Sequence, residues 1–300
     1  MSKMPVITHQ PVLLSEVALG LSLKKGETLV DATLGEGGHA EALGVFLGKN
    51  GTLVGFELDP KALATSVLRL KKLTSRKIFF PKSYREMEKL LPEAGIEKVD
   101  AVLFDLGLGS HQLKEGGRGF SFQTDEPLNM RFDAGSGVSA ADLLNTATED
   151  ELAAIFFGYG GERYANRIAK AIVAKRKEKF ISTTKELRDL VWQAVPPGAR
   201  HGRLDPATKT FQALRMAVND ELSAISEGLA AGFQLLNSGG RMAVISFHSL
   251  EDGIVKRFFK GKKESGQGEL YNKKPITPSA EEMIQNPRSR SAKLRIIKKL

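Results

Sequence analysis

The sequence predicts an α/β protein with a doubly wound, Rossmann-like sheet that is interrupted by an inserted helical domain. Short apolar runs that end in glycine or acidic residues alternate with segments that repeat apolar residues every three or four positions. This alternation is typical of strands joined by right-handed helical crossovers, which build a parallel sheet. The alternation stops for a helical stretch near residues 113–205 and resumes after it, which indicates an insertion.

Composition limits the possible functions. With 300 residues, 41% of them hydrophobic, the chain is long enough for one large domain or two modest ones. Its 44 Lys and Arg against 35 Asp and Glu give a formal charge of +9, which favours a polyanionic partner. The absence of cysteine excludes disulfides, thiolate zinc sites and cysteine nucleophiles. The histidines show no metal-ligand spacing, so we expect no metal site.

No apolar stretch approaches the roughly 20 residues that cross a bilayer. The first eleven residues also lack the apolar run of a signal peptide. We therefore expect a cytoplasmic protein without a membrane partner; the sequence specifies no oligomeric state.

The first part of the chain contains three predicted strand and helix units and a fourth strand. Strands are expected at residues 29–34, 52–56, 78–80 and 101–105, with helices at 41–47, 62–73 and 85–91. Later segments are predicted as several helices over 140–194, one long amphipathic helix over 211–236, a strand at 242–247, a helix at 254–259, a loop or lid over 261–287 and a last strand at 294–297. The expected domains are 1–112 with 206–300 for the sheet, and 113–205 for the insert.

Ligands of such sheets bind at the carboxyl ends of the strands. Gly35, Gly37 and Gly38 follow the first strand and allow a ligand to approach the backbone closely. Glu57 follows the second strand and is placed to accept hydrogen bonds from ribose hydroxyls, and Asp105 ends the fourth. The glycine spacing also fits a nicotinamide enzyme, but Asp31 would repel a pyrophosphate and attract an ammonium or sulfonium group.

Eight short motifs, taken in their order along the chain, resemble those of one known protein family. They are Asp31–His39 (DATLGEGGH), Phe104–Leu113 (FDLGLGSHQL), Arg118–Phe122 (RGFSF), Pro127–Arg131 (PLNMR), Tyr159–Arg163 (YGGER), Thr210–Arg215 (TFQALR), Ser246–Asp252 (SFHSLED) and Asn286–Arg290 (NPRSR). Together they closely resemble the bacterial 16S ribosomal RNA cytosine-N4 methyltransferase family (RsmH or MraW), nearly end to end. The resemblance implies a class I methyltransferase that uses S-adenosyl-L-methionine to methylate a cytidine in the decoding region of the small ribosomal subunit.

The resemblance also implies the residues of a cofactor site: Gly37, Gly38, His39, Glu57, Tyr84, Asp105 and Gln112. Three features depart from the family pattern. Glu57 stands where aspartate is common, and it conserves the role of binding the ribose. The stretch after Asp105 has Gly109 and Ser110 where two serines are common, and it ends in Gln112-Leu113-Lys114 where the family commonly has Gln-Leu-Asp. Asn129 replaces a common aspartate and is a candidate substrate contact.

Methyl transfer to an exocyclic amine requires the acceptor to be held in line with the methyl group and to lose a proton. Asp105 is our candidate proton acceptor. Because methylation at cytosine C5 usually needs a cysteine adduct, the cysteine-free composition independently favours an amine or hydroxyl acceptor. A flipped base needs an aromatic platform and phosphate contacts; the candidates are Phe120, Phe122, Phe247, Arg163, Arg167, Arg200, Arg203, Arg288 and Arg290.

Two other functions fit parts of the pattern. A nicotinamide-dependent oxidoreductase with a helical cap would bind NAD and not S-adenosyl-L-methionine. A non-catalytic RNA-binding assembly factor would keep the fold without the reaction, although intact Gly37, Gly38, Glu57 and Asp105 oppose that interpretation.

Overall fold

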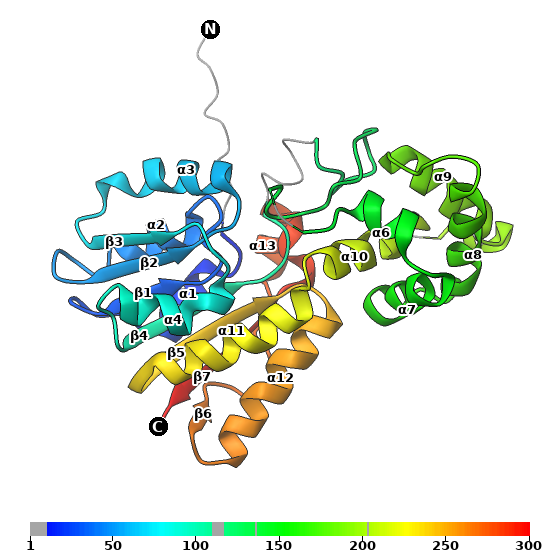
Figure 1. Ribbon diagram of the computed structural model, residues 1–300. Coiled ribbons are helices and arrows are strands. Elements are labelled where there is room, and N and C mark those ends of the chain that lie inside the picture. Colours follow the sequence, from blue (N-terminus) through cyan, green and yellow to red (C-terminus); the bar gives the residue numbers. More distant parts are fainter. Residues whose placement is uncertain (1–10, 110–116, 136, 203) are drawn as a thin grey trace, which may run out of the picture. The chain divides into compact units, whose positions relative to one another are not determined.

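The structure is a computed structural model, and it describes residues 11–109, 117–135, 137–202 and 204–300. Contacts divide the chain into two compact units, one formed by residues 1–109 with 222–300 and the other by residues 110–221 (Figure 1). The first unit contains the sheet. Its boundary lies at residue 222, whereas the sequence placed it at residue 206.

The sheet unit is a seven-stranded sheet in the order β3-β2-β1-β4-β5-β7-β6. Its strands are β1 (Thr28–Asp31), β2 (Thr52–Phe56), β3 (Arg76–Phe80), β4 (Val99–Asp105), β5 (Leu236–Ser246), β6 (Gly268–Leu270) and β7 (Lys293–Lys299). Strands β1 to β5 pair in parallel, and β7 pairs antiparallel with both β5 and β6. The doubly wound fold is confirmed; the sequence did not predict β6.

Helices cover both faces of the sheet. They are α1 (Leu14–Leu21), α2 (Gly38–Gly44), α3 (Pro60–Arg69), α4 (Met87–Glu93), α11 (Glu221–Leu235), α12 (Ser249–Glu264) and α13 (Ala280–Gln285), with short 3-10 turns η1 (Leu70–Lys72), η2 (Tyr84–Glu86) and η4 (Pro287–Ser291). Because side chains alternate along a strand, Val30, Val102 and Val244 pack with α4, α11 and α12. Leu29 and Leu103 face the other way, toward α1 and α2.

The second unit is helical, as predicted. It contains α6 (Ala140–Thr146), α7 (Glu149–Gly160), α8 (Ala165–Arg176), α9 (Thr184–Ala194), η3 (Pro197–Ala199) and α10 (Ala207–Val218). Ser139, Thr148 and Thr183 each begin a helix with a capping box, in which the cap hydroxyl accepts from a backbone N–H and an acidic side chain three residues later accepts from the cap N–H. Helix α7 packs against α8 and α10.

Two predicted segments are wrong. The single helix over 211–236 is broken between α10 and α11, where Asp220 has a φ of +46°. There, Asn219 accepts from the backbone N–H of Phe132 and donates to the carbonyl of Met130, so its side chain is fixed by a loop of the insert. The loop predicted over 261–287 instead contains the end of α12, β6 and α13.

Candidate functional site

Two glycines at the start of α2, Gly37 and Gly38, belong to the glycine loop after β1 and lie close to neighbouring side chains. Gly37 has a φ of +79°, and a Cβ added there would lie 3.2 Å from Cβ of Ser66. A Cβ on Gly38 would lie 3.1 Å from Cγ of Pro11. Only glycine adopts the Gly37 backbone without strain, so the tight turn explains its presence there.

Three carboxylates lie at the ends of the neighbouring strands β2, β1 and β4. Glu57 accepts from two backbone N–H groups, that of Gly35 at 2.8 Å and that of Asp59 at 2.7 Å. Asp31 accepts from the N–H of Thr33 at 3.2 Å. These bonds connect the glycine loop to the strand ends, as expected where parallel strands meet at one edge.

Thr33 links the glycine loop to the third carboxylate. Its hydroxyl oxygen accepts from the backbone N–H of Asp105 at 2.6 Å. The side chain of Asp105 has one oxygen, Oδ1, that is buried and has no hydrogen-bond partner among the described residues. A buried carboxylate oxygen without a donor is unfavourable in a folded protein, so this atom is placed to receive a ligand.

His39 lies beside Asp105, and its Nδ1 faces the Asp105 carboxylate. Its Nε2 is 2.9 Å from the carbonyl oxygen of Val12, which accepts only, so Nε2 must donate. Its Nδ1 is 3.4 Å from Oδ2 of Asp105, another acceptor. Although burial of the ring opposes the charged form, the Asp105 carboxylate raises the pKa of His39 above its usual value. The ring is therefore placed so that, in its charged form, it donates to Val12 from Nε2 and to Asp105 from Nδ1.

Asp31 completes a site that is rich in negative charge. Only 1% of its surface is exposed. Burial raises its pKa from 3.8 to about 7; the His39 charge opposes that shift, and Asp105 and Glu57 add to it. Such a group gains from a nearby positive charge, so the cluster suits a cationic ligand better than a phosphate.

The two aromatic candidates of the sheet unit lie on different loops. Tyr84 packs edge to face on Phe104, with ring centroids 5.4 Å apart, and against Gly228 of α11. Phe247 follows β5 and lies against Gly107, where an added Cβ would be 3.3 Å from its ring. Phe247, a candidate for stacking on the substrate base, therefore lies beside the loop that follows Asp105.

A buried glutamate, Glu251, fixes the backbone around Phe247. It accepts from the N–H of Phe247 at 2.7 Å and from the N–H of His248 at 3.2 Å. Sequence reasoning missed Glu251 and Thr33 as parts of this site. The capping pattern at the start of α12, an acidic residue three positions after His248, was the available signal for Glu251.

The aromatic candidates of the insert unit pack inside it. Phe120 is 8% exposed and stacks with Phe132 at 5.8 Å between centroids. Phe122 contacts Phe211 edge to face at 4.9 Å. Both therefore serve the packing of the insert, whatever their part in binding a substrate.

The polar candidates of the insert differ in their surroundings. The side-chain oxygen of Asn129 accepts from both the backbone N–H and Nε of Arg131. Arg200 donates to the carbonyl oxygens of Val195 and Gln193. Arg163 and Arg167 are exposed, with Arg163 lying over the ring of Tyr164.

The remaining candidates lie at the end of the chain or outside the described residues. Arg288 and Arg290 are exposed on η4 of the sheet unit, beside the buried Asn286 and Ser289. Gln112 and Arg203 fall outside the described residues. Within the part of the chain that the structure describes, no group of three metal-ligating side chains is found and no helix is long and apolar enough to cross a membrane.

Comparison with known proteins gives a full-length match. A family model described as the MraW methylase family matches residues 6–300. The chain is 46% identical over 295 residues to the ribosomal RNA small subunit methyltransferase H of Persephonella marina, covering 98% of this chain and 100% of that protein. It is 45% identical over 291 residues to the protein of that name in Sulfurihydrogenibium sp., covering 97% and 99%. The counterpart in Deinococcus radiodurans is 46% identical over 292 residues, covering 97% and 90%.

Proposed function

Because the chain belongs to the MraW methylase family, whose members use S-adenosyl-L-methionine, we propose that it methylates N4 of one cytidine in 16S ribosomal RNA. The observation that carries the chemistry is the buried acidic cluster around the glycine loop, in which one oxygen of Asp105 has no donor among the described residues. The cofactor carries a sulfonium and an ammonium group, and both positive charges fit that cluster. A nicotinamide pyrophosphate would instead meet like charges there.

The loops of the sheet unit divide the work of holding the cofactor. In our proposal, Gly37, Gly38 and His39 form the wall that lies against it. Glu57 keeps two backbone N–H bonds and uses its remaining lone pairs for the ribose hydroxyls. Tyr84, packed on Phe104, borders the adenine. Gln112 lies outside the described residues and is proposed as a cofactor residue from the family resemblance alone. Asp31 lies within the acidic cluster and supports binding of the positive charges.

Asp105 and His39 handle the proton of the acceptor amine. The bound cofactor supplies an electrophilic methyl group. The free oxygen of Asp105 accepts a hydrogen bond from the N4 amine of cytosine, which localises the nitrogen lone pair for an in-line attack. His39 donates to the other carboxylate oxygen and so fixes the orientation of Asp105. After transfer, Asp105 takes the proton that N4 loses.

The RNA contacts are proposed for both units. Phe247, which lies against Gly107 in the loop after Asp105, is the proposed stacking platform of the sheet unit. Exposed arginines, Arg163 and Arg167 of the insert and Arg288 and Arg290 of η4, are proposed to contact phosphates. We propose that residues 113–205 recognise the substrate and that the enzyme acts in the cytoplasm on the small ribosomal subunit.

Transfer of labelled methyl groups tests the proposal. The protein, labelled S-adenosyl-L-methionine and small subunits from a strain lacking this modification are incubated, and the nucleosides are separated by mass. We expect N4-methylcytidine from the unmodified protein and none from Asp105→Ala, which keeps its RNA affinity because it removes no phosphate contact. Cofactor binding without transfer to subunits or naked RNA would refute the proposed acceptor. Unchanged turnover of Asp105→Ala would remove Asp105 from the mechanism.

A further inference from the structure

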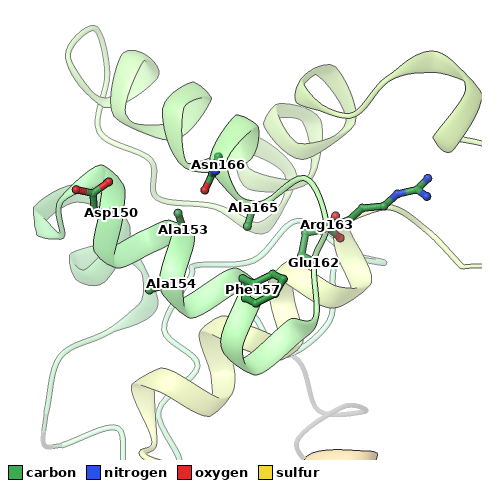
Figure 2. A pocket seen from close by; sticks show the side chains of 8 residues that line it. All are labelled: Asp150, Ala153, Ala154, Phe157, Glu162, Arg163, Ala165 and Asn166. Atoms are coloured by element: carbon green, nitrogen blue, oxygen red, sulfur yellow. The ribbon is translucent and has the colours of Figure 1, made fainter.

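A groove runs between α7 and α8 of the insert unit (Figure 2). The groove is open to solvent on one side and has a volume of about 470 Å³. One wall is the face of α7 that presents Asp150, Ala153, Ala154 and Phe157. The other includes Arg163, in the turn before α8, and Asn166 in the first turn of α8. The spacing of the α7 residues, at intervals of three and four, places them along one helix face.

The α7 face of the groove is open to solvent although it carries a large aromatic side chain. Phe157 is 69% exposed, whereas its neighbour Phe156 is fully buried in the core of the insert. Ala153 and Ala154 are small and leave space in front of the Phe157 ring (Figure 2). An exposed aromatic beside a shallow apolar floor is a surface on which a flat ring can stack.

The α8 side of the groove supplies positive charge that the protein leaves uncompensated. Arg163, Arg167 and Lys170 are exposed and make no ion pair with any described residue. At 3.6 residues a turn, Asn166, Arg167 and Lys170 lie within an arc of about 100° on α8, and Arg163 lies in the turn that precedes this helix. The neighbouring cations differ, since Lys175 pairs with Glu178 and Lys179 with Glu186.

Two acidic side chains also border the groove, and they do not cancel this charge. Glu162 is buried and already accepts from the backbone N–H of Tyr164. Asp150 lies in the first turn of α7, at the opposite end of the lining from Arg163 (Figure 2). With the Asn166 amide, Asp150 offers acceptors of the kind that bind the amino groups of bases.

We propose that this groove binds an unpaired nucleotide of ribosomal RNA, distinct from the cytidine that is methylated. The base stacks on Phe157, its polar edge meets Asp150 and Asn166, and the phosphates on either side contact Arg163, Arg167 and Lys170. The unpaired cations and the net charge of +9 favour a nucleic acid over a protein segment. The inference rests on the proposed function for the identity of the RNA.

Direct binding measurements test the groove without relying on turnover. Affinity for naked 16S ribosomal RNA and for small subunits is measured for the unmodified protein, Phe157→Ala and the control Phe180→Ala. Phe180 belongs to the same unit, is 54% exposed and does not line the groove. Since both side chains project into solvent, neither substitution disturbs the core. We expect Phe157→Ala to weaken binding to naked RNA by about five- to a hundredfold, and Phe180→Ala to leave it unchanged.

Two further measurements separate the parts of the proposal. RNA carrying 5-iodouridine is irradiated in the complex, and the crosslinked peptide is expected to include Phe157. Arg163→Gln and Arg167→Gln are each expected to reduce the slope of log affinity against log salt by about 1. Binding and crosslinking are read even if no methyl transfer is found, so failure of the proposed reaction and failure of the groove are distinguishable.

Two results would overturn the inference. If Phe157→Ala binds naked RNA as tightly as Phe180→Ala does, no base stacks in the groove. If Phe157→Ala weakens binding to assembled subunits but not to naked RNA, the occupant is a segment of a ribosomal protein.

Discussion

Replacing Asp31 by asparagine should make the protein more stable near pH 8 while weakening its cofactor site. Asparagine has nearly the same shape and keeps an oxygen that accepts from the N–H of Thr33. It removes a negative charge that is buried beside Asp105 and Glu57. We therefore expect the variant to change two quantities in opposite directions: the free energy of unfolding without cofactor rises, and the affinity for the positively charged cofactor falls.

The magnitude follows from the pKa of Asp31, which burial raises from 3.8 to about 7. Between these values the folded protein holds a proton that the unfolded chain has lost, so stability falls as pH rises from about 4 to about 7. At 1.36 kcal/mol per pH unit the loss reaches about 4 kcal/mol above pH 7. The variant lacks this loss, which already includes the attraction between Asp31 and His39 because that attraction lowers the same pKa. We expect a net gain of about 2 to 4 kcal/mol at pH 8 and almost none at pH 4.

The assay must report on the sheet unit. The single tryptophan, Trp192, lies on α9 of the insert, so its fluorescence follows the other unit. We would measure hydrogen exchange of peptides that span β1 from pH 5 to pH 8 and correct it for the intrinsic pH dependence of exchange. The protection of these peptides gives the free energy of unfolding of the sheet unit. A variant that is less stable at pH 8 and keeps the pH dependence of the unmodified protein would refute the reasoning, because Asp31 would then be ionised and held by His39 throughout.

Three further substitutions test other contacts. His39→Gln should lower the free energy of unfolding more at pH 6 than at pH 9. A raised pKa of His39 gives stability that is lost as the pH rises through that pKa. Equal losses in urea unfolding at both pH values would contradict a charged His39 ring. Glu57→Gln replaces one of the two carboxylate oxygens that accept from backbone N–H groups by an amide NH2 group, which is itself a donor. Calorimetry should therefore show cofactor affinity at least tenfold weaker, and unchanged affinity would remove Glu57 from the site. Gly228→Ala puts a Cβ 2.5 Å from Tyr84 and should destabilise by about 1 to 3 kcal/mol in urea unfolding. The control Gly158→Ala, with no atom within 4 Å, should stabilise its helix by up to about 1 kcal/mol, and equal effects would refute the packing argument.

The sequence predicted the features of the fold that depend on local patterns. Strands β1, β2 and β4 are short apolar runs followed by glycine or acidic residues, and parallel pairing then brings Asp31, Glu57 and Asp105 to one edge. The break before α11 was not predictable in this way. The apolar spacing continues through Asp220, and the break is fixed by bonds from Asn219 to residues far away in the chain.

The contacts within the site also exceeded what the pattern predicted. His39 was expected near the cofactor, but its pairing with Asp105 and with the carbonyl of Val12 depends on the tertiary fold. Thr33 and Glu251 act through bonds to backbone N–H groups, which periodicity does not reveal. The exposure of Phe157 is likewise a tertiary property, since its helix spacing fits a core position equally well.

The place of the insert in the chain has a consequence for the order of folding. β4 and β5 are neighbours in the sheet, yet residues 106–235 separate them. The entropy of closing so long a loop grows slowly with length, by about 0.6 kcal/mol per doubling, so it affects the folding rate more than the final stability. An insert that folds first, from its own capped helices, shortens the effective loop. We therefore expect substitutions that weaken caps such as Ser139 to slow the pairing of the distant strands β4 and β5, as stopped-flow refolding would show.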